Sequence, residues 1–358
     1  MTSETTGYPW AAGSATGMGS MPGVDPLTAA RAVFDELPEL PHLPELPGRG
    51  PGAEMIGRAA ALLTDLPAEL TPAGWRLAGR PGRDLRRARD CLSHDLDVLE
   101  EVAQGWAGPL KVQVCGPWTL AAGLELPASQ ELALTDRGAV ADLVASLAEG
   151  VAAHVEEVAG RIPGADVLVQ IDEPGLPAVL DGAIPSASGW RRLPPVEAGP
   201  ATDGLRTLIA AAAVPAIVHC CAAHPPFGLF REAGAAAVAA DLSLLTGKDE
   251  DAFAETVEAG LGILAGVIQG TAAPQPQHTT AARAPGAAAA QPQAAGLARL
   301  ITGRWQRIGL PLAPVTRQVV ITPACGLAGA TPERATAVLA ACREAARILP
   351  ELIEEGTA

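Results

Sequence analysis

A histidine and two cysteines fall where expected strands end, and their types suit a metal ion. In His219-Cys220-Cys221 the first and third residues of an extended chain point to the same side, so His219 and Cys221 can face one ion. Cys325 ends a second apolar run and Asp241 ends a third. One imidazole, two thiolates and one carboxylate form a ligand set that suits Zn²⁺. The alternative is that these cysteines are small buried hydrophobic residues.

A second group of polar residues could bind a substrate. An apolar run leads directly into Asp172 and Glu173, and paired carboxylates can bind an ammonium group or transfer protons, although a capped turn is the simpler alternative. Ser20 lies in a Gly/Pro turn that can offer a hydroxyl and backbone N–H groups to a carboxylate. Trp118 can wall a pocket, or can belong to the core. We take these four as candidate substrate-binding residues.

Eight short apolar runs alternate with helix-forming segments along the chain. The runs predict strands at 16–20, 40–45, 110–115, 166–171, 216–220, 236–241, 262–268 and 318–322. Apolar spacing and capping residues predict helices at 26–37, 53–65, 84–104, 139–160, 249–260, 297–308 and 332–349. Alternating strands and helices indicate a parallel sheet, and eight strands favour an α/β fold of the (β/α)₈ TIM-barrel type. The active site of such a barrel lies at the C-terminal ends of the strands, where the candidate residues fall.

The sequence predicts one domain. Residues 1–12 are expected to form a disordered tail and residues 13–358 the barrel. Residues 271–295 are low in complexity and rich in Ala, Pro and Gln, which predicts a mobile loop.

Charge and composition limit the function classes. The chain has 25 Lys and Arg against 40 Asp and Glu, a net charge of −15, which opposes binding to nucleic acid or to an anionic membrane. Six cysteines in 358 residues are too few for a disulfide framework. Leu208–Val218, the longest apolar run, is shorter than the ~20 residues that a spanning helix needs. We therefore expect a cytoplasmic protein with reduced thiols.

Five motifs in order carry a family resemblance: GSMPG (19–23), VQVCGPWTL (112–120), VQIDEP (169–174), VHCC (218–221) and TPACGL (322–327). Together they resemble the catalytic barrel of cobalamin-independent methionine synthase, in a short single-barrel form, over about residues 15–350. The resemblance implies a zinc-dependent enzyme that methylates the thiol of homocysteine to form methionine. It implies that His219, Cys221 and Cys325 bind Zn²⁺, with Asp241 in place of the family's glutamate. It further implies that Ser20 holds the amino-acid carboxylate and Asp172 the ammonium group.

The methyl-donor side departs from the family pattern. Gly123 stands where the family has a tryptophan that stacks on the folate pterin, and Ala178 replaces an acid that binds the pterin. The family's general-acid histidine falls near Thr271, so we assign no catalytic residue. The expected donor is therefore either methyl-tetrahydrofolate or a methylated corrinoid protein, which would be a partner.

Other functions remain open. A zinc-dependent alkyl or methyl transferase for another thiol, such as a coenzyme thiol, would keep the metal site, and so would a non-catalytic zinc-binding barrel. Uroporphyrinogen decarboxylase, another barrel enzyme, needs arginines for its substrate's carboxylates, and the early part of this chain has no basic cluster.

Overall fold

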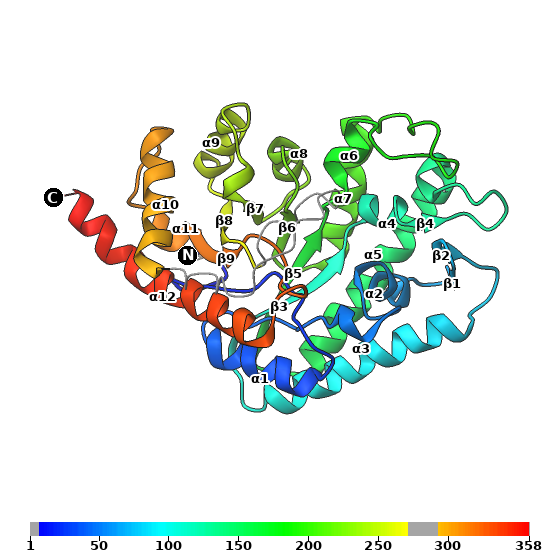
Figure 1. Cartoon of the computed structure of the whole chain (residues 1–358), viewed down its shortest axis with the longest axis horizontal. Helices are drawn as coiled ribbons and strands as arrows, with labels where there is room; N and C mark the ends of the chain where they lie inside the picture. The colour runs from blue at the N-terminus through cyan, green and yellow to red at the C-terminus, as the bar shows by residue number, and fades with distance from the viewer. Residues whose placement is uncertain (1–6, 271–292, 358) are drawn as a thin grey trace, which may run out of the picture.

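The computed structural model describes residues 7–270 and 293–357, and a curled parallel sheet of six strands forms its centre (Figure 1). The strands pair in chain order: β3 (Gly108–Cys115), β5 (Ala165–Asp172), β6 (Ala216–Cys220), β7 (Ala237–Asp241), β8 (Gly262–Ile268) and β9 (Val319–Pro323). Their side chains are almost all buried, because helices pack on the outer face of the sheet and the inner face surrounds the packed interior of the barrel. All six were predicted, with bounds that differ by two residues at most.

Two extended segments close the sheet into a barrel. Ala15 forms a parallel bridge to Ile321 of β9, and His42 forms one to Lys111 of β3. A third bridge, from Ser20 to Glu45, joins the two segments to each other. The (β/α)₈ prediction is therefore confirmed.

The first two predicted strands, 16–20 and 40–45, are bridges in place of full strands. In the second segment, Pro41 and Pro44 lack the N–H groups that a continuous ladder needs. In the first, Gly19 has a φ of 114°, which interrupts the extended backbone.

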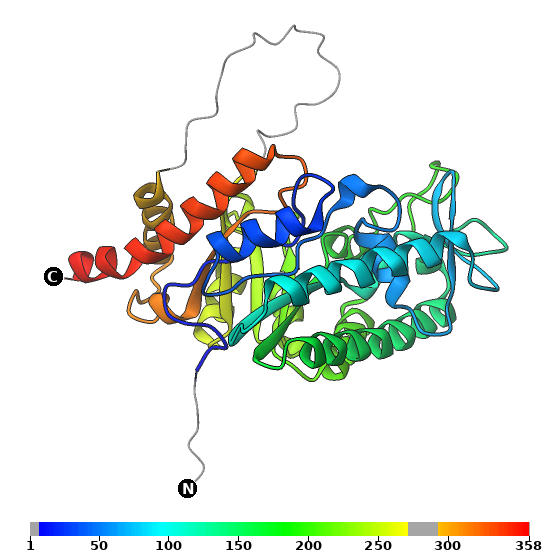
Figure 2. The same ribbon diagram turned by 90° about the horizontal axis from the view of Figure 1, so that it is seen from below.

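Helices surround the sheet. They are α1 (Pro26–Glu36), α2 (Met55–Leu62), α3 (Arg83–Val102), α5 (Arg137–Arg161), α7 (Ala198–Ala212), α8 (Phe227–Glu232), α9 (Glu250–Glu258), α10 (Ala294–Arg307) and α12 (Pro332–Thr357), with the short α4 (Pro117–Ala121), α6 (Leu176–Leu180) and α11 (Val315–Gln318). Figure 2 shows α12, α1 and α3 following one another along one side. By length and composition α5 is the one described helix that could cross a membrane, and half of its most apolar stretch is buried in this fold.

A small second sheet lies beside α3 and was not predicted. It contains the hairpin β1 (Ala68–Thr71) and β2 (Gly74–Leu77), with β4 (Leu124–Glu125) parallel to β2. The buried Trp75 of β2 donates its indole N–H to Glu54 Oε1 at 2.6 Å, which ties this sheet to the start of α2.

Alternation along the strands separates two apolar clusters. One cluster fills the barrel interior and includes Leu168 of β5 and Ile217 of β6. The other lies between the sheet and the helices and includes Ile171 and Cys220. Because residues two apart share a face, His219 follows Ile217 into the interior, and Cys220 faces the helices as expected.

The predicted tail and loop fall largely outside the described residues. Residues 1–6 and 271–292 lie there, and with them Thr271. Within the described part, Trp10 is buried in the interior cluster and donates its indole N–H to Arg317 O at 3.1 Å.

Candidate active site

A cavity of about 270 Å³ lies at the C-terminal ends of the barrel strands. It brings together five residues that the sequence singled out: Ser20, Asp172, His219, Cys221 and Cys325. They come from four different parts of the chain. Its other lining residues are Met18, Glu45, Pro47, Ala53, Glu54, Met55, Pro174 and Gly326.

The two thiols at this cavity are neighbours. The Sγ atoms of Cys221 and Cys325 lie 3.2 Å apart, within hydrogen-bonding distance, and both cysteines are free. A proton shared between them lowers the pKa of Cys325 to about 6 and raises the pKa of Cys221. When its ring is protonated, His219 also lowers the pKa of Cys325 through its positive charge. The pair therefore holds one thiolate near neutral pH, and thiolate is the form that binds metals.

His219 is held by Asp172. The Nδ1 and Oδ1 atoms lie 2.7 Å apart, and both side chains are buried. Because a carboxylate only accepts hydrogen bonds, Nδ1 carries a proton, and in the neutral ring Nε2 then keeps its lone pair. Nε2 is buried and has no hydrogen-bond partner among the described residues. A ring nitrogen in this state is ready to bind a cation, and a carboxylate on the other nitrogen is typical of metal-bound histidines.

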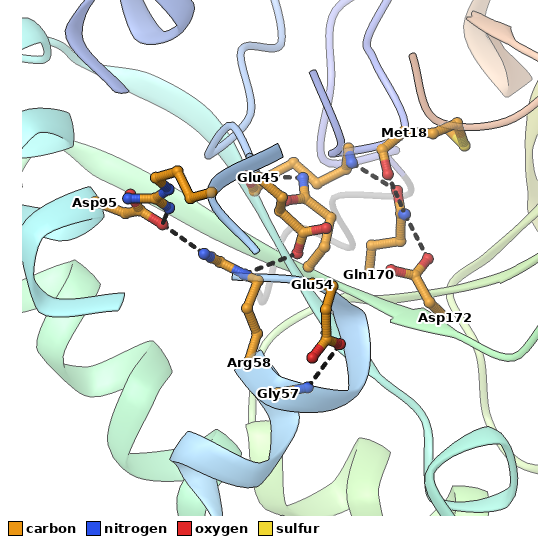
Figure 3. A network of polar contacts seen from close by, with 11 residues as sticks. Met18, Glu45, Glu54, Gly57, Arg58, Asp95, Gln170 and Asp172 are labelled. Atoms are coloured by element: carbon orange, nitrogen blue, oxygen red, sulfur yellow. Dashed lines mark hydrogen bonds and ion pairs between the residues drawn. The ribbon is translucent and has the colours of Figure 1, made fainter. Parts of the chain in front are cut away.

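A polar network supports Asp172 from inside the barrel (Figure 3). Gln170 Nε2 donates to Asp172 Oδ1 at 2.7 Å and to Met18 O at 3.0 Å, and Gln170 Oε1 accepts from Lys111 Nζ at 2.5 Å. Lys111 is fully buried, and burial lowers its pKa to about 7.

A second network holds Glu45, which the substrate-binding predictions omitted. Arg58 Nε lies 3.3 Å from Glu45 Oε1, and Arg58 Nη1 lies 2.5 Å from Asp95 Oδ2 (Figure 3). Asp95 Oδ2 also accepts from Arg49 Nη2 at 2.7 Å. Burial raises the pKa of Glu45 to about 7. The sequence could have indicated Glu45, because Glu45 ends a predicted strand, as Ser20 does.

Ser20 packs directly on the loop that carries Cys325. The backbone N–H of Leu327 donates to Ser20 O at 2.7 Å. A Cβ on Gly326 would lie 1.9 Å from Ser20 Oγ, so a larger residue there would displace the Ser20 hydroxyl from its present position.

Glu173 and Trp118 lie outside the cavity. The fully buried carboxylate of Glu173 accepts from the N–H groups of Trp118 at 2.9 Å and Thr119 at 2.8 Å, and from the Thr119 hydroxyl at 2.7 Å. These bonds give acceptors to the backbone N–H groups in the first turn of α4, which have no partner within the helix. Burial raises the pKa of Glu173 to about 7. The indole of Trp118 donates to Ala201 O at 2.9 Å and borders a separate space of about 660 Å³ between α5 and α7.

Asp241 also lies outside the lining of the cavity. Its Oδ1 accepts from the N–H and hydroxyl of Ser243 at 2.9 and 2.6 Å, and its Oδ2 accepts from Gln269 Nε2 at 2.7 Å. Over residues 7–270 and 293–357, no three His, Cys, Asp or Glu side chains are grouped closely enough to hold a metal ion as they stand.

Fold and site together define a (β/α)₈-barrel protein with a thiol-lined cavity at its C-terminal face. Residues 128–348 match the family model described as the catalytic domain of cobalamin-independent synthase, so the chain belongs to the cobalamin-independent methionine synthase family. Among solved structures, a B12-independent methionine synthase from Shewanella sp. W3-18-1 in complex with selenomethionine is similar in fold, with a TM-score of 0.61 and 11% identity. The match covers 96% of this chain and 100% of that one. No curated protein matches the chain.

Proposed function

We propose that this protein transfers a methyl group to the thiol of homocysteine, with Zn²⁺ bound by His219, Cys221 and Cys325. The observation that carries the proposal is the cavity shared by two adjacent thiols and a histidine whose Nε2 has no partner among the described residues. This donor set suits zinc, which favours nitrogen and sulfur ligands. Bound zinc would keep a substrate thiol deprotonated, and therefore nucleophilic, at neutral pH.

The protein's own groups would bind and orient the amino acid. Asp172 and Glu45 line the same cavity, and two carboxylates suit an ammonium group. Ser20 would offer its hydroxyl to the substrate carboxylate. We do not include Glu173 or Trp118 among the groups that touch substrate, because their polar atoms bind α4 and Ala201.

The proposed methyl donor is one of the two candidates from the sequence, methyl-tetrahydrofolate or a methylated corrinoid protein. A Cβ on Gly123 would lie 2.8 Å from Ile56 Cδ1, so a side chain here that could stack on a pterin would have to displace Ile56. A corrinoid protein as donor remains a prediction. Methionine formation from homocysteine, measured with methyl-tetrahydrofolate and methylcobalamin in parallel, decides between the donors. A coenzyme thiol offered in place of homocysteine checks the acceptor.

Neighbouring cysteines provide a matched test of the zinc site. Cys221→Ser should lose bound zinc and methyl transfer, whereas Cys220→Ala should keep both, because Cys220 faces the helices. Zinc content of the purified protein and methionine formation are the two measurements. Retention of zinc and activity in Cys221→Ser would contradict the proposal.

Asp241 is a further proposed ligand that the same assay can test. It would have to give up the contacts with Gln269 or Ser243 described above. Loss of zinc in Asp241→Asn supports ligation, and full retention removes Asp241 from the ligand set.

A further inference from the structure

We propose that Arg58 is a positioning residue, which holds the carboxylate of Glu45 at the cavity so that the site selects thiols carrying an ammonium group. The inference rests on the proposed function for the role of Glu45 in binding the amino acid. It deepens that function, because it makes the amino group of the acceptor a condition for tight binding. Arg58 itself lies behind the wall and is not among the residues that line the cavity.

The arginine lies between two carboxylates and is enclosed with them (Figure 3). Its Nε lies 3.3 Å from Glu45 Oε1, and its Nη1 lies 2.5 Å from Asp95 Oδ2. The side chains of Arg58, Glu45 and Asp95 are 5%, 10% and 1% exposed. Because so little water reaches these groups, solvent cannot take the place of a lost ionic partner.

The two carboxylates are not held equally. Asp95 Oδ2 also accepts from Arg49 Nη2 at 2.7 Å, so Asp95 has two arginines. Glu45 has one, since Arg58 is the one described side chain that forms an ion pair with it. Loss of Arg58 would therefore leave Asp95 paired and Glu45 without an ionic partner in the described part of the chain.

The surroundings of Glu45 make an unpaired carboxylate costly. Burial raises the pKa of Glu45 to about 7, and the negative charges of Asp172 and Asp95 raise it further. Arg58 is the largest charge that opposes them, ahead of Lys111. Without Arg58, this carboxyl group would take up a proton more readily and would no longer be held in place. A neutral carboxyl group binds ammonium less well, because charge-assisted hydrogen bonds are the stronger ones.

The cavity offers a cationic ligand group more than it offers an anionic one. Three carboxylates line it, Glu45, Glu54 and Asp172, whereas no lysine or arginine is among its described lining residues. Glu54 already accepts from the N–H groups of Trp75 and Gly57. Glu45 and Asp172 are therefore the carboxylates that can accept from a substrate. A thiol without an ammonium group would leave them with no counter-ion inside the cavity.

Homocysteine and its analogue without the amino group isolate this interaction. The two compounds share the thiol and the carboxylate, so any contribution of these groups, or of zinc, cancels in the ratio of their dissociation constants. Calorimetric titration of the purified protein measures both constants without turnover. The wild type should bind homocysteine at least ~10-fold more tightly than the desamino analogue, as expected for a hydrogen bond between charged groups.

Two variants of Arg58 test its part in this preference. Arg58→Met should weaken homocysteine binding ~10-fold and leave binding of the desamino analogue unchanged. Arg58→Gln, which also lacks the charge but keeps a polar side chain, should do the same, and it serves if the methionine variant does not fold. Arg49→Met is the matched control. It removes the other arginine from Asp95, so it should lower the unfolding midpoint without changing the ratio.

Glu45→Gln tests the route from Arg58 to the substrate. It should lose the same preference, and the Arg58→Met/Glu45→Gln double variant should be no worse than Glu45→Gln, because groups that act together are not additive. A wild-type ratio in the folded Arg58 variants would overturn the inference. Equal weakening of both ligands would also overturn it, since that is the result of a merely structural role.

The same titrations separate this inference from the proposed function. If the wild type prefers homocysteine and the Arg58 variants lose the preference, but no methionine forms with either donor, the positioning role stands and the proposed function fails. If methionine forms but the wild type binds both compounds equally well, the proposed function stands and the positioning role fails.

Discussion

Removal of Asp95 should be among the most destabilising single changes in the barrel wall. Asp95 Oδ2 accepts from Arg58 at 2.5 Å and from Arg49 at 2.7 Å, and its side chain is 1% exposed. Asp95→Ala leaves Arg58 buried with Glu45 as its remaining acidic partner and deprives Arg49 of its own. Removal of one partner from a buried ionic group costs ~3–5 kcal/mol, because the remaining charge stays desolvated. Urea unfolding followed by circular dichroism measures this loss as a lower midpoint.

The same helix supplies a matched control. Asp97, two residues further along α3, also pairs with an arginine: its Oδ1 lies 2.8 Å from Arg161 Nη1, but its side chain is 60% exposed. Asp97→Ala should cost less than about 1 kcal/mol, since exposed pairs are screened and Arg161 keeps Glu157 and Glu100. Equal losses in the two variants would refute the argument that burial makes the Asp95 cluster important.

Three further predictions concern His154, Gly326 and Glu173. Burial and the charge of Arg58 lower the pKa of His154 to about 4. The free energy of unfolding of the wild type should therefore fall by up to about 3 kcal/mol as the pH falls from 6.5 to 4. His154→Leu should not show this loss when urea unfolding of the two proteins is compared across that range. Gly326→Ala should displace Ser20 and raise the KM for homocysteine about tenfold at unchanged zinc content; an unchanged KM would remove Ser20 from the substrate site. Glu173→Gln should lower the free energy of unfolding by ~1–3 kcal/mol and keep zinc, and a selective loss of substrate binding would instead return Glu173 to the site.

The sequence predicted the six strands well because their apolar runs are buried on both faces, a pattern that loops and surface helices do not share. It also predicted that Ser20, Asp172, His219 and the two thiols would meet, since strand ends share one face of a barrel. The hairpin at Ala68–Leu77 was missed because its strands are only four residues long and partly exposed. Such segments carry little periodic signal.

The supporting networks were beyond prediction from the sequence. Lys111 lies inside an apolar run, and nothing local shows that its partner is Gln170, 59 residues away. Arg58 and Asp95 likewise sit on two helices whose contact depends on the complete fold. Partner choice for buried charges depends on long-range packing, which strand and helix periodicity do not encode.

The alternation of side chains along β5 explains why these networks lie directly behind the cavity. On β5, Leu168, Gln170 and Asp172 point to the same interior face, so the apolar filling, the polar relay and the cavity wall follow one another at steps of two residues. The carboxylate at the end of that series therefore lies above a dry, low-dielectric interior, where an unpaired charge is costly. Lys111 below balances the charge of Asp172, as Arg58 balances that of Glu45, and His219 beside it donates a hydrogen bond to Asp172. A cavity with two carboxylates on such an interior needs cations within the wall, and these buried side chains supply them without occupying the space that a substrate would take.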